Sequence, residues 1–203
     1  MKVLAPIRHS DEVVPLLDAG AGEFYCGIAP PGWEEAFGSV AVHRRSAKSA
    51  GVPGLDDLRR IVALAGDRPV FATLNAPSYP AAAIPRLVEF GRALVEDEGV
   101  AALIVAELEL VLALREAGLA SRVHVSSLAT CRNPGAAAFY RSLGVARVIL
   151  PRHVTLAEIE TTAIPGLEWE VFALNDGCTF EEGTCSTTHA FRPYGIDDRV
   201  GDA

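Results

Sequence analysis

The chain has 203 residues, of which 50% are hydrophobic, and its formal net charge at pH 7 is −8. This length suffices for one domain with a sizeable core, and the negative charge disfavours non-specific binding to DNA or to anionic membranes. No apolar run reaches the roughly 18 residues that span a bilayer. The start, MKVLAPIRHSDEVV, is a poor signal peptide because Pro6, Arg8 and His9 interrupt it. We therefore expect a cytoplasmic protein without a membrane span.

Short apolar segments alternate with amphipathic helical patterns along the whole chain. Seven segments predict strands, at residues 2–6, 23–28, 69–75, 101–106, 122–127, 147–151 and 168–174. Between them, patterns such as GLDDLRRIVALAG place apolar residues on one helix face, and Pro85 suits the first turn of the next helix. Glycines follow several of these patterns at the position where a helix commonly ends.

The alternation of strands and helices predicts an α/β fold with a parallel sheet. A dinucleotide-binding fold is disfavoured because LAPIRHSDE, after the first strand, contains no glycine. Seven evenly spaced strands favour a (β/α) TIM-like barrel that is short by about one βα unit, since such barrels typically have eight. It would be an incomplete barrel or a seven-stranded one. We expect residues 1–188 to form this barrel and residues 189–203 to form an irregular C-terminal tail.

One long connection, from residue 28 to residue 51, interrupts the regular pattern. In a barrel it follows the second strand at the C-terminal face, where long loops usually shape the active site. It carries the basic run HRRSAK with Arg44 and Arg45, which is either a solvated loop or a contact for a phosphate or another anion of the substrate. Asn75 ends the third strand and could orient a substrate by hydrogen bonds.

Four cysteines follow or end predicted strands: Cys26, Cys131, Cys178 and Cys185. In a barrel all four would lie at the C-terminal rim. Clustered thiolates suit a 4Fe–4S cluster or a tetrahedral zinc ion, and a zinc site from Cys178, Cys185 and His189 is also conceivable. Two alternatives stay open at this point. The thiols could be inert packing residues, or one of them could be a reactive nucleophile.

The segment EVFALNDGCTFEEGTCSTT resembles the signature of peptidase family U32, the collagenase-like peptidase family. Glu170, Phe172, Cys178, Gly183 and Cys185 match that signature at its spacing, and the similarity covers nearly the whole chain. The resemblance implies a (β/α) barrel. Some relatives are linked to oxygen-independent hydroxylation of quinone precursors and RNA bases with an iron–sulfur cluster, some work as heterodimers, and the family name implies a hydrolase.

Three residues are candidates for acid–base catalysis. Glu170 would either point to the barrel centre as a base or metal contact, or point outward to a basic residue of a helix. Asp176 follows the same strand, and His153 follows the sixth strand, although a single histidine is more often a solvated loop residue. No GxSxG or HExxH motif supports proteolysis independently of the resemblance.

The sequence therefore predicts a family-U32-like barrel with a site at its rim built around Cys178 and Cys185. These two cysteines would bind an iron–sulfur cluster or another metal, and the protein would act in a hydroxylation or other modification reaction, or as a hydrolase. The substrate implied by the resemblance is a peptide, a quinone precursor or an RNA base. The alternative is a non-catalytic scaffold or a partner subunit of a homo- or hetero-oligomer, which would cover the open edge of a short barrel.

Overall fold

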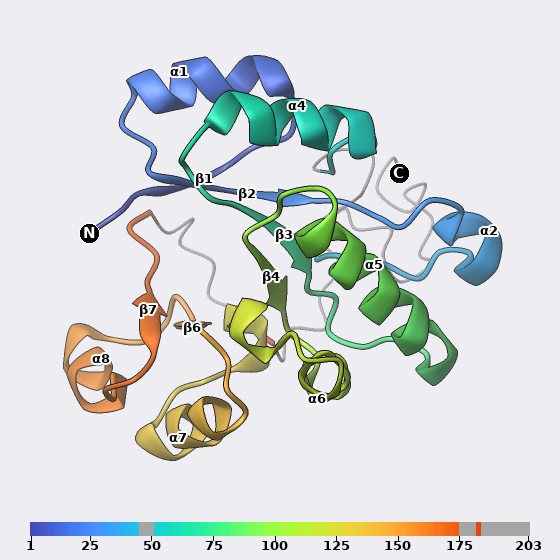
Figure 1. Cartoon of the computed structure of the whole chain (residues 1–203). Helices are drawn as coiled ribbons and strands as arrows, with labels where there is room; N and C mark the ends of the chain where they lie inside the picture. The colour runs from blue at the N-terminus through green and yellow to red at the C-terminus, as the bar shows by residue number, and fades with distance from the viewer. Residues whose placement is uncertain (45–50, 175–181, 184–203) are drawn as a thin grey trace, which may run out of the picture.

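A computed structural model of the chain describes residues 1–44, 51–174 and 182–183. Its centre is one sheet of seven parallel strands in the order β1-β2-β3-β4-β5-β6-β7 (Figure 1). The strands are β1 (Leu4–Pro6), β2 (Glu23–Gly27), β3 (Val70–Leu74), β4 (Ala102–Val105), β5 (Val123–Val125), β6 (Arg147–Ile149) and β7 (Glu168–Glu170). The predicted strands, their parallel direction and the α/β class are confirmed.

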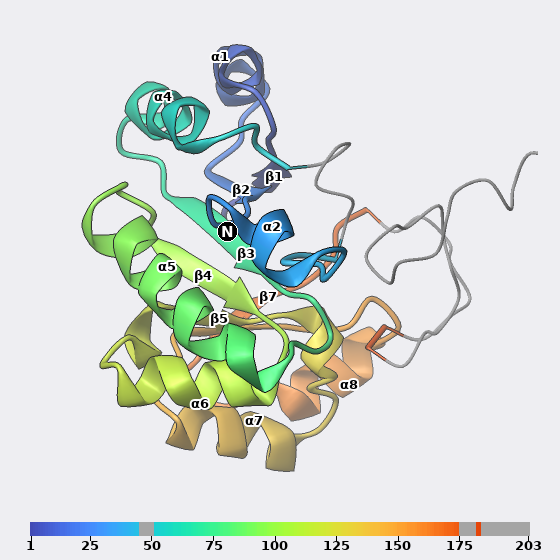
Figure 2. The same cartoon turned by 90° about the vertical axis from the view of Figure 1, so that its right-hand side faces the viewer.

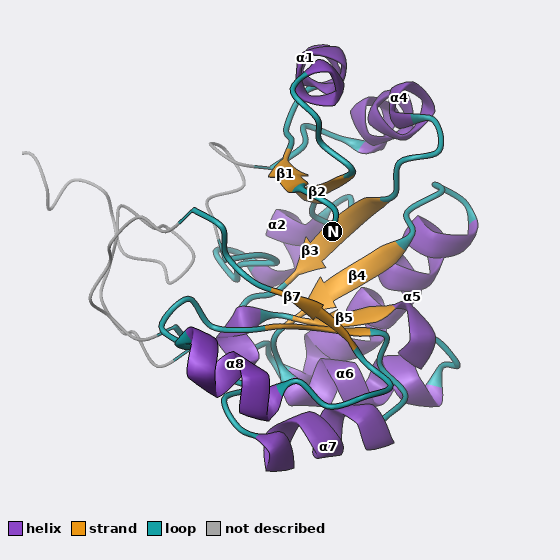
Figure 3. Cartoon of the chain, turned by 90° about the vertical axis from the view of Figure 1, so that its left-hand side faces the viewer, coloured by secondary structure: helices purple, strands orange, loops and turns teal. Residues whose placement is uncertain are grey.

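Helices connect successive strands and cover the outer face of the curled sheet (Figures 2 and 3). They are α1 (Val13–Asp18), α2 (Trp33–Phe37), α4 (Leu55–Ala65), α5 (Ile84–Glu96), α6 (Leu108–Glu116), α7 (Pro134–Ser142) and α8 (Leu156–Thr162). Short 3-10 helices are η1 (Ser10–Glu12), η2 (Ala81–Ala83), η3 (Ala120–Arg122) and η4 (Ser127–Ala129). None of the helices in the described part is long and apolar enough to cross a membrane.

Local sequence explains where individual helices begin and which face they bury. Pro85 lies in the first turn of α5, as predicted, and Thr155 with Glu158 forms a capping box at the start of α8. In α4 the buried residues Leu58, Ile61 and Ala65 recur at helical spacing. The helices therefore pack an apolar stripe onto the outer face of the sheet.

Side-chain alternation along the strands divides the core into two layers. The larger layer lies between the sheet and the helices and receives residues such as Phe24 and Leu103. The smaller layer lines the inner face of the curled sheet and consists of Phe71, Ala102, Ile104 and Ile149. Because successive residues of a strand point to opposite faces, the same parity decides which polar side chains enter the interior.

The sheet is a half-barrel that is open between its first and last strands. Over the described residues β1 pairs with β2 and β7 pairs with β6, but β1 and β7 do not pair with each other. The expectation of a barrel short by about one unit is therefore confirmed. The predicted domain boundary at residue 188 lies outside the described residues.

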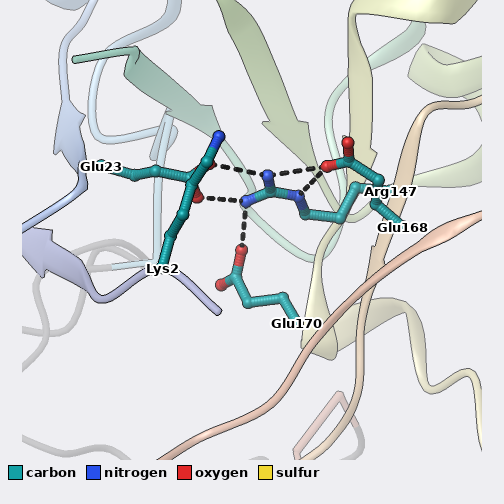
Figure 4. A network of polar contacts seen from close by, with 5 residues as sticks. All are labelled: Lys2, Glu23, Arg147, Glu168 and Glu170. Carbon is teal, nitrogen blue, oxygen red and sulfur yellow. Dashed lines mark hydrogen bonds and ion pairs between the residues drawn. The ribbon is translucent and has the colours of Figure 1, made fainter.

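Arg147 crosses the interior and links the two halves of the sheet (Figure 4). It extends from β6, and its Nη1 and Nη2 atoms lie 2.7 Å from Oε2 and 3.0 Å from Oε1 of Glu23 on β2. It also donates to Glu168 and Glu170 on β7, at 2.8 Å and 3.1 Å. Lys2 lies 3.2 Å from Oε1 of Glu23. This cluster of five residues, the interior network, joins the two ends of the open sheet.

Replacing Arg147 by Met should lower the free energy of unfolding by about 3 kcal/mol or more, because the buried Glu23 and the half-buried Glu170 would lose the guanidinium between them. Urea unfolding at pH 7 measures this. Arg60→Met is the matched control, since Arg60 is exposed on α4 and its ion pair in the described part of the chain is with Asp57 in the preceding turn, at 3.8 Å. Equal stability of the two variants would contradict a structural role for the network.

Candidate functional site

Glu170, the glutamate of the recognised motif, points into the half-barrel. It is the last residue of β7, and its Oε2 accepts a hydrogen bond from Nη1 of Arg147 at 3.1 Å (Figure 4). Burial raises the pKa of this carboxyl, Arg147 opposes the rise, and Glu23 adds to it, so the net pKa is raised. Of the two orientations that the sequence left open, Glu170 takes the one toward the barrel interior and not the one toward a helix. A carboxyl with a raised pKa suits proton transfer.

His124 is a second interior group, which sequence reasoning passed over. Its ring lies edge-on to Phe71 with centroids 4.6 Å apart, and the guanidinium carbon of Arg147 lies 5.1 Å from the Phe71 centroid. Burial, followed by the charge of Arg147, lowers the pKa of His124 to about 4. Its Nδ1 is buried without a hydrogen-bond partner among the described residues. The signal was its position between Val123 and Val125, where alternation turns the imidazole inward.

The segment after β2 is folded back onto the C-terminal ends of β2 and β3. Tyr79 donates its hydroxyl hydrogen to the carbonyl of Val42 at 2.5 Å and accepts from the N–H of Ala76 at 3.1 Å. The side-chain oxygen of Asn75 accepts from the N–H of Arg44 at 3.0 Å. Two predicted substrate residues, Asn75 and Arg44, are thus brought together, with Asn75 holding the basic segment in place.

His43 is buried in this folded segment. Its ring packs against Gly27, where an added Cβ would lie 2.7 Å from ring atoms Cε1 and Nε2. Burial lowers the pKa of His43 to about 4. The ring also borders a cavity of about 210 Å³ that contains residues Gly51–Gly54 in its wall. The neutral His43 ring therefore packs directly on the backbone of Gly27 and forms part of the cavity wall.

Glu107 is a further carboxyl at this face that was not among the predicted site residues. It follows β4 at the start of α6, where burial raises its pKa, a hydrogen bond from the Tyr79 backbone lowers it, and Glu109 raises it further. The net pKa is raised, and its Oε2 is buried without a hydrogen-bond partner in the described part of the chain. The sequence signal was its place directly after a strand.

The ends of β5 and β6 meet Glu182, which lies between the two motif cysteines in the sequence. Glu182 accepts hydrogen bonds from Oγ of Ser127 at 3.2 Å and from the N–H of Arg152 at 2.9 Å. Cys131, four residues after Ser127 in the sequence, is fully buried, and burial raises the pKa of its thiol to about 11. The neighbouring His153 is exposed, and its role in acid–base chemistry stays a prediction.

Cys26 occupies a different place from the one that the sequence suggested. It lies within β2 rather than beyond its end, is buried between sheet and helices, and its thiol faces the Phe71 carbonyl at 3.8 Å. Strand alternation is the reason, because Glu23 and Gly27 of the same strand take the inner positions. Burial raises the pKa of this thiol to about 12. A packed, protonated thiol describes Cys26 better than a rim ligand does.

Four predicted site residues, Cys178, Cys185, Asp176 and Arg45, lie outside the described residues, as does His189. Within residues 1–44, 51–174 and 182–183, no group of three or more His, Cys, Asp and Glu side chains is arranged to hold a metal ion. The roles of Cys131, Cys178 and Cys185 as metal or cluster ligands therefore stay predictions.

Comparisons with known proteins agree with the fold. The sequence model of peptidase family U32 matches residues 9–197. The chain is 32% identical over 93 residues, 45% of its length, to tRNA hydroxylation protein P of Escherichia coli (strain K12), of which the match spans 20%. The solved structure of the U32 peptidase Mk0906 superposes with a TM-score of 0.61 at 17% identity, over 84% of this chain and 68% of that one. A proposed phosphonomutase from Burkholderia cenocepacia J2315 gives 0.55 at 17% identity, over 87% and 80%.

The two buried histidines should make the protein acid-sensitive. The pKa of His43 and of His124 is about 4 in the folded chain, against an ordinary value of 6.5. Between these values the unfolded chain binds more protons, so the free energy of unfolding should fall as the pH drops from 6.5 to about 4. Each histidine contributes a slope of up to about 1.4 kcal/mol per pH unit.

Urea unfolding of His124→Gln across this pH window should show a shallower slope than the parent. His153→Gln, at an exposed position, is the matched control. A parental slope in His124→Gln would show that His124 does not stay neutral in the folded chain.

Proposed function

Because the chain belongs to peptidase family U32, we propose that it takes part in the hydroxylation or another modification of an RNA base. The match to tRNA hydroxylation protein P supports this choice of substrate class over a peptide or a quinone precursor. The chain spans about a fifth of that relative's length. The observation that carries the proposal is Glu170, a motif carboxyl that lies in the interior of the half-barrel with a raised pKa.

In this proposal Glu170 is the group that exchanges a proton with the substrate. Arg147 fixes the direction of its carboxyl and limits the rise of its pKa. Asp176 and His153 are further acid–base candidates. Arg44 and Arg45 would contact substrate phosphates, since guanidinium groups match their geometry. Asn75 holds the backbone of Arg44, the first arginine of this basic run.

We also propose that Cys178 and Cys185 hold a metal centre, either a 4Fe–4S cluster or zinc. The thiol donors suit both groups. A cluster would supply electron transfer, and zinc would act as a Lewis acid. Cys26 and Cys131 are both buried in the apolar core between sheet and helices, so neither thiol is exposed as a ligand in the described structure.

A second candidate function is a non-catalytic scaffold or partner subunit. It is favoured by the outer edge of β7, which is unpaired within the described residues and is followed by the exposed apolar residues Val171, Phe172 and Leu174. An open strand edge and an apolar surface both suit a protein partner. A partner subunit would leave the modification reaction independent of Glu170, which separates the two functions. Hydrolysis, which the family name suggests, would instead appear as cleavage of a peptide substrate.

The metal proposal is tested by iron, sulfide and zinc analysis of protein purified without oxygen. Cys178→Ser and Cys185→Ser should each lose most of the bound metal and melt at a lower temperature, because ligation stabilises the folded chain. Cys26→Ala is the matched control and should keep the metal content of the parent. Full metal content in both serine variants would show that these thiols are not ligands.

The catalytic proposal is tested by mass spectrometry of tRNA nucleosides from cells that lack the gene and carry it back on a plasmid. Glu170→Gln should lower the rate of modification by about 100-fold or more, because it removes the proton-transferring carboxyl. Glu168→Gln is the control, since Glu168 also binds Arg147 but is 67% exposed. Equal modification by the parent and Glu170→Gln would favour the partner-subunit function, and no modified tRNA nucleoside with either would exclude tRNA as the substrate.

A further inference from the structure

A cavity of about 210 Å³ lies beyond the C-terminal end of β2. Its wall contains Ile28 and Ala29, which follow this strand, His43, and residues 51–54, which precede α4. None of the five residues of the interior network is among the described residues of this wall. The cavity is therefore separate from the carboxyl of Glu170.

Backbone contacts hold the wall of this cavity in place. The N–H of Val52 donates to the carbonyl of Gly27 at 2.7 Å, and Gly27 and Gly51 form a parallel bridge. Nε of Arg8 donates to the carbonyl of Gly51 at 3.3 Å. A wall that is fixed before a ligand arrives loses less conformational freedom on binding.

His43 contributes an unused polar atom to this region. The residue is 3% exposed, and its Nε2 is buried without a hydrogen-bond partner in the described part of the chain. On one side of His43 in the sequence, Tyr79 binds the carbonyl of Val42, and on the other side Asn75 accepts from the N–H of Arg44. Leaving a buried polar atom without a partner is costly, so a ligand that pairs with Nε2 would be favoured.

Helix α4 begins at the same wall. Its N-cap is Gly54, which has no side chain to accept hydrogen bonds from the N–H groups of the first turn. With 11 residues, α4 carries a partial positive charge at this end. The N–H groups and the partial charge together favour an anion.

Two carboxylates in the first turn of α4 are paired with arginines of the same helix. Asp56 lies 2.9 Å from Nη1 of Arg59, and Asp57 lies 3.8 Å from Nη1 of Arg60. Neither aspartate is among the residues of the cavity wall. Their charges therefore oppose an anion at the start of α4 only weakly.

We propose that this cavity binds one phosphate group of the RNA substrate, with Nε2 of His43 and the N–H groups at the start of α4 as donors. This inference rests on the proposed function for the identity of the substrate. Burial lowers the pKa of His43 to about 4, so the ring is neutral at pH 7 and can donate from Nε2. Gly51 and Gly54 allow a phosphate to approach the backbone closely. Arg44, a predicted phosphate contact, directly follows His43.

Titration calorimetry with inorganic phosphate tests the role of His43. His43→Leu should weaken phosphate binding by about tenfold or more, the loss expected for a hydrogen bond to a charged group. His43→Gln should restore most of the binding, because its amide nitrogen can donate in place of Nε2. His153→Gln, at an exposed position, is the control and should bind phosphate like the parent. Unchanged binding by His43→Leu would overturn the role of His43 as a donor.

Gly54→Asp separates phosphate binding from stability. The backbone at Gly54 has φ −177°, and an added Cβ would meet no heavy atom within 4 Å. The new carboxylate should raise the melting temperature because it caps α4. It should also weaken phosphate binding by about tenfold or more, because it occupies the same N–H groups and repels the anion. Gly54→Ala is the control and should keep the binding, whereas parental phosphate binding by Gly54→Asp would overturn the site.

An unmodified RNA oligonucleotide distinguishes RNA from a small phosphate compound as the ligand. It should compete with inorganic phosphate for the parent protein at constant ionic strength, and Gly54→Asp should weaken its binding while Gly54→Ala should not. Phosphate binding without competition by RNA would overturn the assignment to RNA. Failure of the proposed function is seen separately, as tRNA nucleosides that stay unmodified although the parent protein binds phosphate and RNA.

Discussion

The ion pair between Arg147 and Glu23 is the interaction on which the shape of the half-barrel depends. The sheet has two unpaired edges, and within the described residues backbone hydrogen bonds join only strands adjacent in sequence. Curling such a sheet brings β2 opposite β6, and the bidentate pair connects them across the interior at 2.7 Å and 3.0 Å. Burial raises the pKa of Glu23, but Arg147 and Lys2 together lower this pKa by more than burial raises it. The carboxyl of Glu23 therefore stays charged. The same guanidinium orients Glu170 and adds to the effect of burial, which lowers the pKa of His124.

At the C-terminal face, polar side chains near the strand ends bind the backbone of loops that pack against this face. Asn75 and Tyr79 bind the backbone of Arg44 and Val42. Ser127 binds the carboxylate of Glu182, and Arg132 binds its carbonyl. In parallel α/β sheets this face usually carries the active site, and here its loops are anchored to the rigid part of the fold. Glu170 ends β7, and Glu107, a second carboxyl with a raised pKa, directly precedes α6.

Sequence reasoning located the strands well because buried parallel strands are continuous apolar runs. The same property hid the interior polar residues. Arg147 and His124 each interrupt an apolar run once, and only their parity relative to neighbours such as Val148 and Val125 reveals that they point inward. Parity also explains Cys26, which the sequence placed at the rim because the strand was read as ending there. The anchoring role of Glu182 depends on a long-range hydrogen bond to Ser127, for which no local pattern exists.

The distance along the chain between Arg147 and Glu23, 124 residues, has a consequence for how the protein folds. Each strand pairs with its immediate predecessor, so the sheet can grow by successive short loop closures, while the interior pair must wait until β6 has formed. Contacts that close long loops late contribute little to the folding transition state. We therefore expect Arg147 mainly to lower the rate constant of unfolding and to change the rate constant of folding little. The interior network would then determine the lifetime of the native state rather than the speed at which it forms.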